Sequence, residues 1–287
     1  MRSNPPSGPM HIPAEFHYRL QGVTRGVNPG AHRGRALGSG MEFRGYQGLL
    51  DQPDPRRYDV RASLRDAFGG PRFRAYSQPA SVPVTALADL SASMAFADKM
   101  TLLAEFIAAA GFSAYRSGDP FGFVGCDTKP RMDLLLPSTR SKQAATQLVQ
   151  KLRDWQPEGA TADGLLAAKY WIKQQPGLIF LCSDFHLPLP LLDKLLASLA
   201  QHRVVPVVFW QSAEYDTLPR FGLVDVLDPE TGLRRTLLLR PRLRERIRQR
   251  FAARREQLEH CFSRWNAAPL YVLDRFDPDA VTRYFYA

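Results

Sequence analysis

The sequence predicts one α/β domain with a doubly wound, mostly parallel sheet, flanked by helices on both faces and preceded by an N-terminal extended arm. Three observations support this fold class. From Val82 onward, short apolar runs alternate with helical segments, as in chains that form parallel sheets. The apolar runs show little polar alternation, which is typical of strands buried on both faces. The 287 residues suffice for one large core plus an extension.

The first half of the domain opens with the apolar run from Val82 to Ala88, which predicts a strand. A helix is expected over about 96–116, because apolar residues recur there at helical spacing. The further elements expected in this half are a hairpin of strands at 121–126 and 131–136, helices over about 141–155 and 163–175, and a strand at 177–182.

The second half carries an arginine-rich helix. Pro241 predicts where this helix begins, because proline is favoured in the first helical turn, and the apolar spacing continues to about 265. The other elements expected in this half are a helix over about 189–201, a strand at 204–210, a hairpin of 222–227 and 233–239, a last strand at 269–273, and a short helix from 277.

Composition divides the chain into three parts. Residues 1–33 carry proline, glycine, histidine and arginine with little periodicity, which predicts a flexible leader. Residues 34–80 are rich in aromatic residues and arginines but contain few apolar runs, so we expect an N-terminal arm that packs on the main domain. Residues 81–287 form that domain and include the arginine-rich helix at about 241–265.

Cysteine content and hydropathy narrow the class of protein. Cys126, Cys182 and Cys261 are odd in number and widely spaced, so we expect reduced core thiols and neither a disulfide framework nor a thiolate zinc site. No apolar stretch approaches the roughly 20 residues needed to cross a bilayer, and the N-terminus does not look like a secretory signal. We therefore expect a cytoplasmic protein without membrane insertion.

Oxygen donors stand at three of the predicted junctions between strand and helix. In Asp89-Leu90-Ser91-Ala92-Ser93, a carboxylate and two hydroxyls alternate directly after the first strand. Thr161 precedes a helix, and Asp184 follows the strand at 177–182. Loops beyond the carboxyl ends of parallel strands meet at one sheet edge, so these five donors should lie together. Carboxylates, hydroxyls and retained waters suit Mg²⁺, with Mn²⁺ or Ca²⁺ as other candidates.

The ordered set of an Asp-x-Ser-x-Ser motif, a Thr and an Asp resembles the metal-ion-dependent adhesion site (MIDAS) of von Willebrand factor A-like domains. The arm, in Gly38-Ser39-Gly40-Met41-Glu42-Phe43 and in the stretch from Pro55 to Ser63, resembles the segment before this domain in a bacterial MoxR-associated family of unknown function. Members usually read Ile-Asp-Trp where this chain reads Tyr58-Asp59-Val60, and Gly-Asp where it reads Gln52-Pro53-Asp54. These departures indicate a divergent branch.

The resemblance implies a non-enzymatic, Mg-dependent adaptor that holds other proteins through its bound cation. It also implies a MoxR-type AAA+ ATPase as partner, and a role in the assembly or metallation of a client enzyme. One branch of the family is associated with the maturation of methanol dehydrogenase, which makes that enzyme a candidate client. The chain itself has no Walker-type phosphate loop, so we expect no ATP hydrolysis and assign no catalytic residue.

Plainer interpretations exist for the candidate residues. Asp89, Ser91 and Thr161 could be helix N-caps, and Asp163 could replace Thr161 as a cap or accept a hydrogen bond from a ligand. His186 could be a ligand or a base, but we expect it beside the site or at the surface.

Two other functions stay open. A metal-dependent hydrolase or phosphotransferase would turn over a phosphoester. Nucleic-acid binding through the arginine-rich helix would weaken steeply with salt, although no nucleic-acid fold is recognisable. Arg244, Arg248 and Arg255 on that helix could contact an acidic partner protein, but a solvated helix face explains them more simply.

Overall fold

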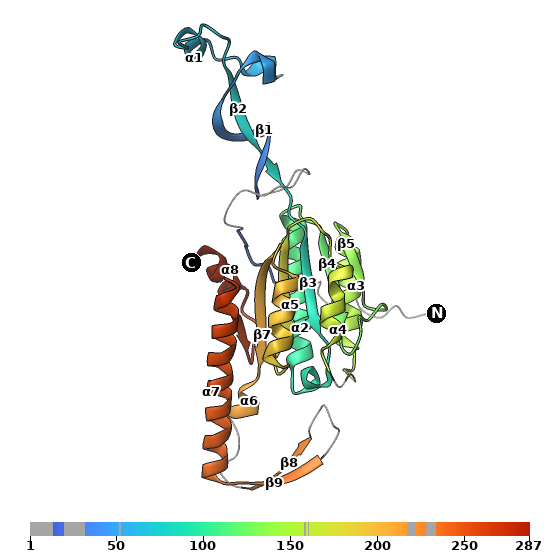
Figure 1. Ribbon diagram of the computed structural model, residues 1–287. Helices are drawn as coiled ribbons and strands as arrows, with labels where there is room; N and C mark the ends of the chain where they lie inside the picture. The colour runs from blue at the N-terminus through green and yellow to red at the C-terminus, as the bar shows by residue number, and fades with distance from the viewer. Residues whose placement is uncertain are drawn as a thin grey trace, which may run out of the picture.

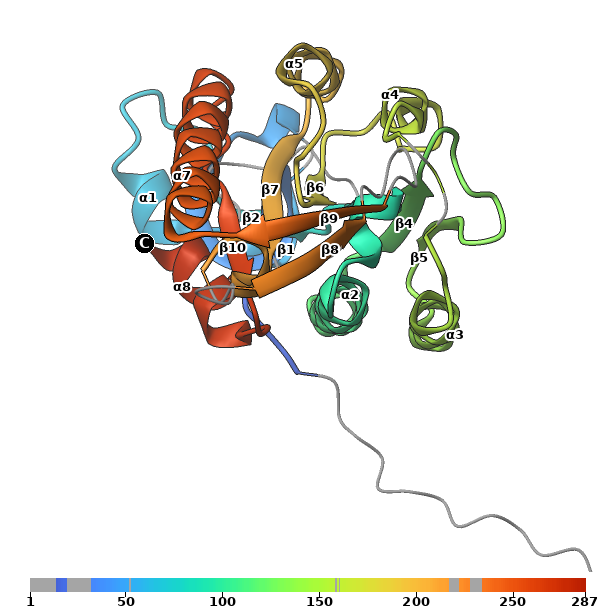
Figure 2. The ribbon, with the colours of Figure 1, turned by 90° about the horizontal axis from the view of Figure 1, so that it is seen from below.

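The main body of the molecule is a six-stranded sheet between two layers of helices (Figure 1, Figure 2). The computed structural model describes residues 14–19, 32–51, 53–157, 159, 161–216, 222–227 and 234–287. The strand order is β10-β7-β6-β3-β4-β5, and every neighbouring pair is parallel except β4 with β5. This arrangement confirms the predicted α/β class with a mostly parallel sheet.

The central strands are buried on both faces, as their apolar sequences predict. Every residue of β3, β4 and β6 is buried. The bounds of the strands in this sheet are β3 Val84–Asp89, β4 Phe121–Cys126, β5 Leu136–Thr139, β6 Leu178–Ser183, β7 Arg203–Trp210 and β10 Leu270–Leu273.

Two apolar cores, one on each face of the sheet, attach the helices. The first core lies under α2 (Lys99–Arg116), α3 (Lys142–Arg153) and α8 (Pro278–Tyr286) (Figure 2). The second lies under α4 (Gly164–Ala167), α5 (Leu189–Ser198) and the C-terminal part of α7 (Pro241–Arg264). The three cysteines are buried and free, which confirms that they are core thiols. None of the helices in the described ranges is both long enough and apolar enough to cross a bilayer.

Two predicted elements differ from the structure. Residues 131–135 turn instead of pairing with β4, and β5 begins only at Leu136. The reason is local, because Arg131 folds back to form an ion pair with the buried Asp127. The helix expected over 163–175 is shorter, with α4 followed by a 3-10 turn, η4 (Ala168–Tyr170).

Part of the expected flexible leader is instead packed into the core. Phe16 and Tyr18 are buried among residues of α2, β6 and α8, and Phe16 stacks on Phe106 with ring centroids 5.9 Å apart. The backbone N–H of Phe16 donates to the Ser113 hydroxyl at 3.0 Å. The expectation is therefore wrong for residues 14–19, because the alternating aromatic side chains of Phe16 and Tyr18 pack into the first core. The rest of the leader lies outside the described residues.

The arm is a β-ribbon that points away from the domain. Strand β1 (His32–Gln47) pairs antiparallel with β2 (Phe73–Ala80), and their far end carries η1 (Leu49–Asp51), η2 (Pro55–Arg57) and α1 (Val60–Leu64) (Figure 1). We expected residues 34–80 to pack on the domain, but the ribbon extends from the amino edge of the sheet. Its two strands pair with each other, with register shifts along β1, so the ribbon forms by internal pairing and not by packing on the domain.

A second extension lies at the opposite, carboxyl edge of the sheet. After β7 come the short helix α6 (Ser212–Tyr215) and an antiparallel hairpin of β8 (Gly222–Leu227) and β9 (Arg234–Leu239). Helix α7 then runs back toward the domain, and Leu258 is its first buried residue. The N-terminal part of this helix therefore overhangs the carboxyl edge (Figure 1).

Candidate metal centre

The Asp89 motif forms one compact corner at the carboxyl edge. Strand β3 ends at the buried Asp89, whose Oδ1 accepts the backbone N–H of Ser91 at 2.9 Å. Its Oδ2 accepts the hydroxyl of Ser183, at the end of the neighbouring β6, at 2.7 Å. The hydroxyls of Ser91 and Ser93 lie 3.2 Å apart. The structure thus brings together the first three predicted donors.

The loop that carries Thr161 lies against this corner. The backbone N–H of Ala92 donates to the carbonyl of Gly159 at 2.8 Å, and Ser91 forms a parallel bridge with Gly159. A Cβ atom on Gly159 would lie 2.3 Å from the Cβ of Asp127, so only glycine permits this close approach. Thr161 itself is exposed. Gly159 therefore lies against the corner, and Thr161 follows two residues later at the surface.

Asp184, the residue directly after β6, contacts a buried lysine. Lys99, the first residue of α2, is fully buried and its Nζ lies 2.9 Å from Oδ2 of Asp184 and 2.6 Å from Oε1 of Glu214. It also donates to the carbonyl of Ser93 at 3.4 Å. Asp184 is thus held in an ion pair and lies next to Asp89, whose pKa its charge affects.

Sequence analysis missed Lys99 and Glu214. A signal for Lys99 does exist, because a cation in the first turn of a helix opposes the helix dipole and needs a compensating carboxylate. Nothing local identifies that carboxylate, since Asp184 is 85 residues away and Glu214 is 115 residues away. Glu214 is placed by its position in α6, where its Oε2 accepts the backbone N–H of Gln211 at 2.9 Å.

Asp89 and Asp184 differ in how far positive groups compensate their negative charge. Burial would raise the pKa of Asp184, but the positive charge of Lys99 and hydrogen bonds to the carboxylate outweigh it, so the pKa is lowered. For Asp89, burial and then the charge of Asp184 raise the pKa to about 6. Asp89 is therefore the buried carboxylate that lacks a positive partner.

This corner has the chemistry of a hard-cation site. Its donors are a carboxylate and hydroxyls, and hard divalent cations bind such oxygens together with retained waters. Among the described residues, no group of three His, Cys, Asp or Glu side chains could hold a metal ion. The candidate site therefore depends on Ser91 and Ser93, and its donors fit Mg²⁺ better than softer metals.

Comparison with known proteins identifies the family. Residues 54–259 match the family described as "Protein of unknown function DUF58". The chain belongs to this family. A 101-residue stretch is 35% identical to an "Uncharacterized protein in moxR 3'region" of Paracoccus denitrificans, covering 35% of this DUF58 chain and 96% of that protein.

Two solved structures resemble it remotely. One is the conserved hypothetical protein BatB from Bacteroides thetaiotaomicron, with a TM-score of 0.44, 15% identity, and coverage of 72% of this chain and 98% of that one. Another is proximal thread matrix protein 1 from the mussel byssus with a zinc-occupied MIDAS motif, with a TM-score of 0.33, 16% identity, and coverage of 45% and 38%. Likenesses this remote carry no information on function.

The two predicted neighbours of the site in this DUF58 chain differ in their contacts, and only His186 touches a predicted ligand, because its backbone N–H donates to Oδ1 of Asp184 at 3.3 Å. Asp163 is exposed in front of α4 and caps no backbone N–H. His186 stacks over Trp210, with centroids 6.4 Å apart, and its Nε2 lies 3.7 Å from Oε1 of Glu214. His186 therefore lies beside Asp184 and Glu214, and its role toward a cation stays a prediction.

The three predicted partner-binding arginines are engaged within the DUF58 chain. Arg244 donates to the carbonyl of Asp216 at 2.7 Å and Arg248 pairs with the Asp216 carboxylate, which attaches α7 to the end of α6. Arg255 pairs with Glu259 at 2.9 Å and lies over the ring of Tyr271. They stabilise α7, as the simpler interpretation of a helix face requires.

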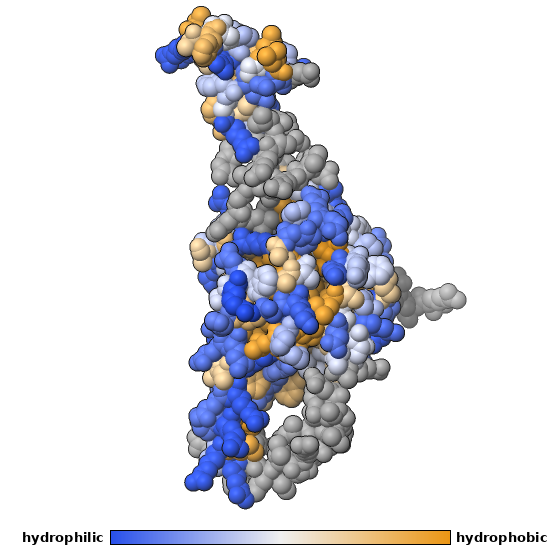
Figure 3. Space-filling view, in the orientation of Figure 1, coloured by the Kyte–Doolittle hydropathy of each residue, from blue (hydrophilic) through white to orange (hydrophobic). Residues whose placement is uncertain are grey.

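Other arginines of α7 remain available. Arg242, Arg246 and Arg250 are exposed and form no ion pair with a described residue, and they lie on the hydrophilic overhang (Figure 3). Arg250 also lines a hollow of about 290 Å³ with His186, Phe251 and Arg254, beside the candidate site. These cations give the carboxyl edge a positive flank.

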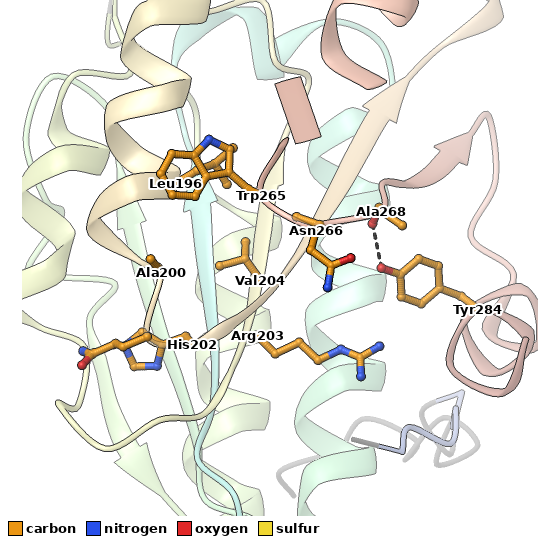
Figure 4. A pocket seen from close by; sticks show the side chains of 11 residues that line it. Leu196, Ala200, His202, Arg203, Val204, Trp265, Asn266, Ala268 and Tyr284 are labelled. Carbon is orange, nitrogen blue, oxygen red and sulfur yellow. Dashed lines mark hydrogen bonds between the residues drawn. The ribbon is translucent and has the colours of Figure 1, made fainter. Parts of the chain in front are cut away.

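A larger hollow, of about 600 Å³, lies at the other edge of the sheet (Figure 4). It is formed by the end of α5, the start of β7 and the segment after α7, and includes His202, Trp265 and Tyr284. The Tyr284 hydroxyl donates to the carbonyl of Ala268 at 2.6 Å. Because β7 begins here and ends at the carboxyl edge, this hollow is separate from the candidate metal centre.

Proposed function

We propose that this DUF58 chain is a non-enzymatic adaptor that binds a partner protein through a divalent cation, with Mg²⁺ as the first candidate. The observation that carries the proposal is the Asp89 corner, where an uncompensated buried carboxylate lies beside two neighbouring hydroxyls. Asp89, Ser91 and Ser93 would hold the cation, and Thr161 would complete the set from the adjacent loop. A cation held by few protein ligands keeps positions for water and for a carboxylate of the partner.

Asp184 has a different role in this proposal from the one its motif suggests. Its Oδ2 is occupied by Lys99 in a fully buried contact, and breaking such a contact leaves a costly unpaired charge. Asp184 would therefore favour the cation by its charge while staying paired with Lys99. Direct binding of the cation falls to Asp89 and the hydroxyls.

The proposed partner is a MoxR-type AAA+ ATPase. Support comes from the Paracoccus relative, which is named for its position in the moxR 3′ region. Together the two proteins would act in the assembly or metallation of a client enzyme, and methanol dehydrogenase is the client to test first. The exposed arginines Arg242, Arg246 and Arg250 would favour an acidic surface on the bound protein.

The test is binding of the purified chain to a MoxR-type ATPase from the same organism, measured on a sensor surface with Mg²⁺ and with chelator. We expect binding with Mg²⁺, and at least a tenfold loss in chelator or in the double variant Ser91→Ala, Ser93→Ala. Ser263→Ala, an exposed serine on α7, is the matched control and should bind normally. Equal binding with Mg²⁺ and with chelator would refute the proposal. Loss of affinity in the control as well would show that the serine variants act unspecifically.

A further inference from the structure

The far end of the arm exposes large apolar side chains. Leu50 is 98% exposed, Phe68 is 92% exposed and Leu64 is 82% exposed, and Leu49 and Val60 are also largely exposed. Figure 3 shows apolar side chains gathered at this end of the molecule. Single exposed apolar residues are common, but a cluster of this size on a projecting element indicates an interaction surface.

Two aspartates hold the tip of the arm in shape. Asp59 caps α1 by accepting the backbone N–H of Ala62 at 3.0 Å, and its other oxygen pairs with Arg74 at 2.7 Å. Asp66 accepts the backbone N–H of Gly70 at 3.1 Å and pairs with Arg72 at 2.5 Å. The tip is thus a built loop that directs its apolar side chains outward, where they add nothing to its own stability.

A positively charged hollow lies beside these apolar side chains. It measures about 600 Å³, and its lining includes Arg61, Arg65, Arg72 and Arg74. Asp59 and Asp66 are its acidic lining residues, so four arginines face two aspartates. Arg61 and Arg65 form no ion pair with a described residue, and they are four positions apart, next to Val60 and Leu64 along α1. Two uncompensated cations therefore border the apolar cluster.

We infer that the tip of the arm docks on the surface of an anionic lipid bilayer. Leu50, Leu64 and Phe68 insert at the boundary of headgroups and acyl chains, and Arg61 and Arg65 bind lipid phosphates. Apolar side chains bordered by cations are the signature of segments that lie on a membrane without crossing it. A bilayer accommodates protruding side chains of any shape, whereas a protein partner would need a matching cavity for each. This contact is peripheral and needs no membrane-spanning segment.

The position of the arm makes this contact compatible with partner binding. The arm continues into β3 at the amino edge of the sheet, while Asp89 ends β3 at the carboxyl edge (Figure 1). A chain docked by its tip therefore holds the candidate metal centre on the side away from the lipid. The inference does not depend on a bound cation.

The test is flotation of the full chain with vesicles in chelator, so that the proposed cation plays no part. We expect the chain to float with vesicles of phosphatidylglycerol and phosphatidylcholine but not with phosphatidylcholine alone. An arginine near an anionic surface contributes about fivefold to binding, so Arg61→Gln with Arg65→Gln should weaken partitioning about 25-fold. Leu64→Ser with Phe68→Ser should reduce it at least tenfold. These side chains are exposed, so circular dichroism should be unchanged.

Matched controls separate the tip from general effects. Arg153→Gln with Lys173→Gln removes two exposed positive charges from the domain, and Met132→Ser with Tyr170→Ser removes exposed apolar side chains from it. Both controls should float like the original chain. The inference is overturned if the chain stays in the dense fraction with anionic vesicles, if the tip variants float unchanged, or if the controls lose as much binding as the tip variants.

Discussion

Replacement of Asp89 by asparagine should stabilise the metal-free protein while abolishing its response to the cation. Burial and the charge of Asp184 raise the pKa of Asp89 from 3.8 to about 6. A carboxyl whose pKa is raised by folding contributes stability below its ordinary pKa, and that stability is lost as the pH rises through about 6. At pH 8 the ionised Asp89 therefore costs about 3 kcal/mol relative to a group with an unshifted pKa.

Asparagine removes this charge with little change in shape. Its carbonyl can still accept the N–H of Ser91, but its amide replaces the carboxylate oxygen that accepts the Ser183 hydroxyl, so that hydroxyl proton loses its acceptor. One hydrogen bond is lost, at a cost of about 1 kcal/mol. The net expectation is a gain of about 2 kcal/mol in the free energy of unfolding at pH 8 in chelator. Below about pH 4 the gain should disappear, because the original carboxyl is then neutral too.

Mg²⁺ should make the original chain more stable than the Asp89→Asn variant, which is the opposite of the order in chelator. At about a hundredfold excess over its dissociation constant, a ligand that binds only the folded state adds about 2.7 kcal/mol. The original chain should gain this amount and the Asp89→Asn variant almost none. Urea denaturation followed by tryptophan fluorescence, at about pH 3.5 and at pH 8 with Mg²⁺ or chelator, measures all terms. The reasoning fails if the variant is no more stable in chelator at pH 8, or if Mg²⁺ stabilises both proteins equally.

Three further substitutions test residues outside the Asp89 motif. Lys99→Met should lower the free energy of unfolding by about 3 to 5 kcal/mol, because it leaves buried carboxylates unpaired, and adding Asp184→Asn should restore part of the loss in a double-mutant cycle. Gly159→Ala should weaken Mg²⁺ binding in calorimetry, since its Cβ would collide with Asp127 and displace the Thr161 loop; unchanged affinity would contradict this. Phe16→Ala should cost about 3 to 5 kcal/mol in urea denaturation, whereas a flexible leader would show no change.

The sheet and the Asp89 corner could be predicted because both depend on residues close together in sequence. Unbroken apolar runs identify β3 and β6, and a strand that ends in Asp89 must place that carboxylate at the carboxyl edge. Ser91 and Ser93 follow within the same loop, so their position is nearly determined once β3 is known. The hydrophobic period and the spacing of residues are sufficient to predict features that depend on residues close together in sequence.

Contacts between distant segments could not be predicted in the same way. Lys99 contacts Asp184 and Glu214 only after α2, β6 and α6 have assembled. No spacing of residues in the sequence predicts these contacts. The low periodicity of residues 1–33 predicts a flexible leader, yet Phe16 and Tyr18 attach residues 14–19 to the core by aromatic contacts and a hydrogen bond. In both cases a few long-range contacts decide the outcome, and average composition does not reveal them.

Lys99 explains how the fold can be stable without the proposed cation. Without Lys99, Asp89 and Asp184 would be neighbouring buried carboxylates, and the fold would depend on a cation to offset both charges. With Lys99 in place, Asp184 stays ionised and paired in the metal-free protein, and only the charge of Asp89 needs a cation. If the proposed function holds, loss of the cation would then cost the partner contact but not the fold, which is the behaviour a reversible adaptor requires.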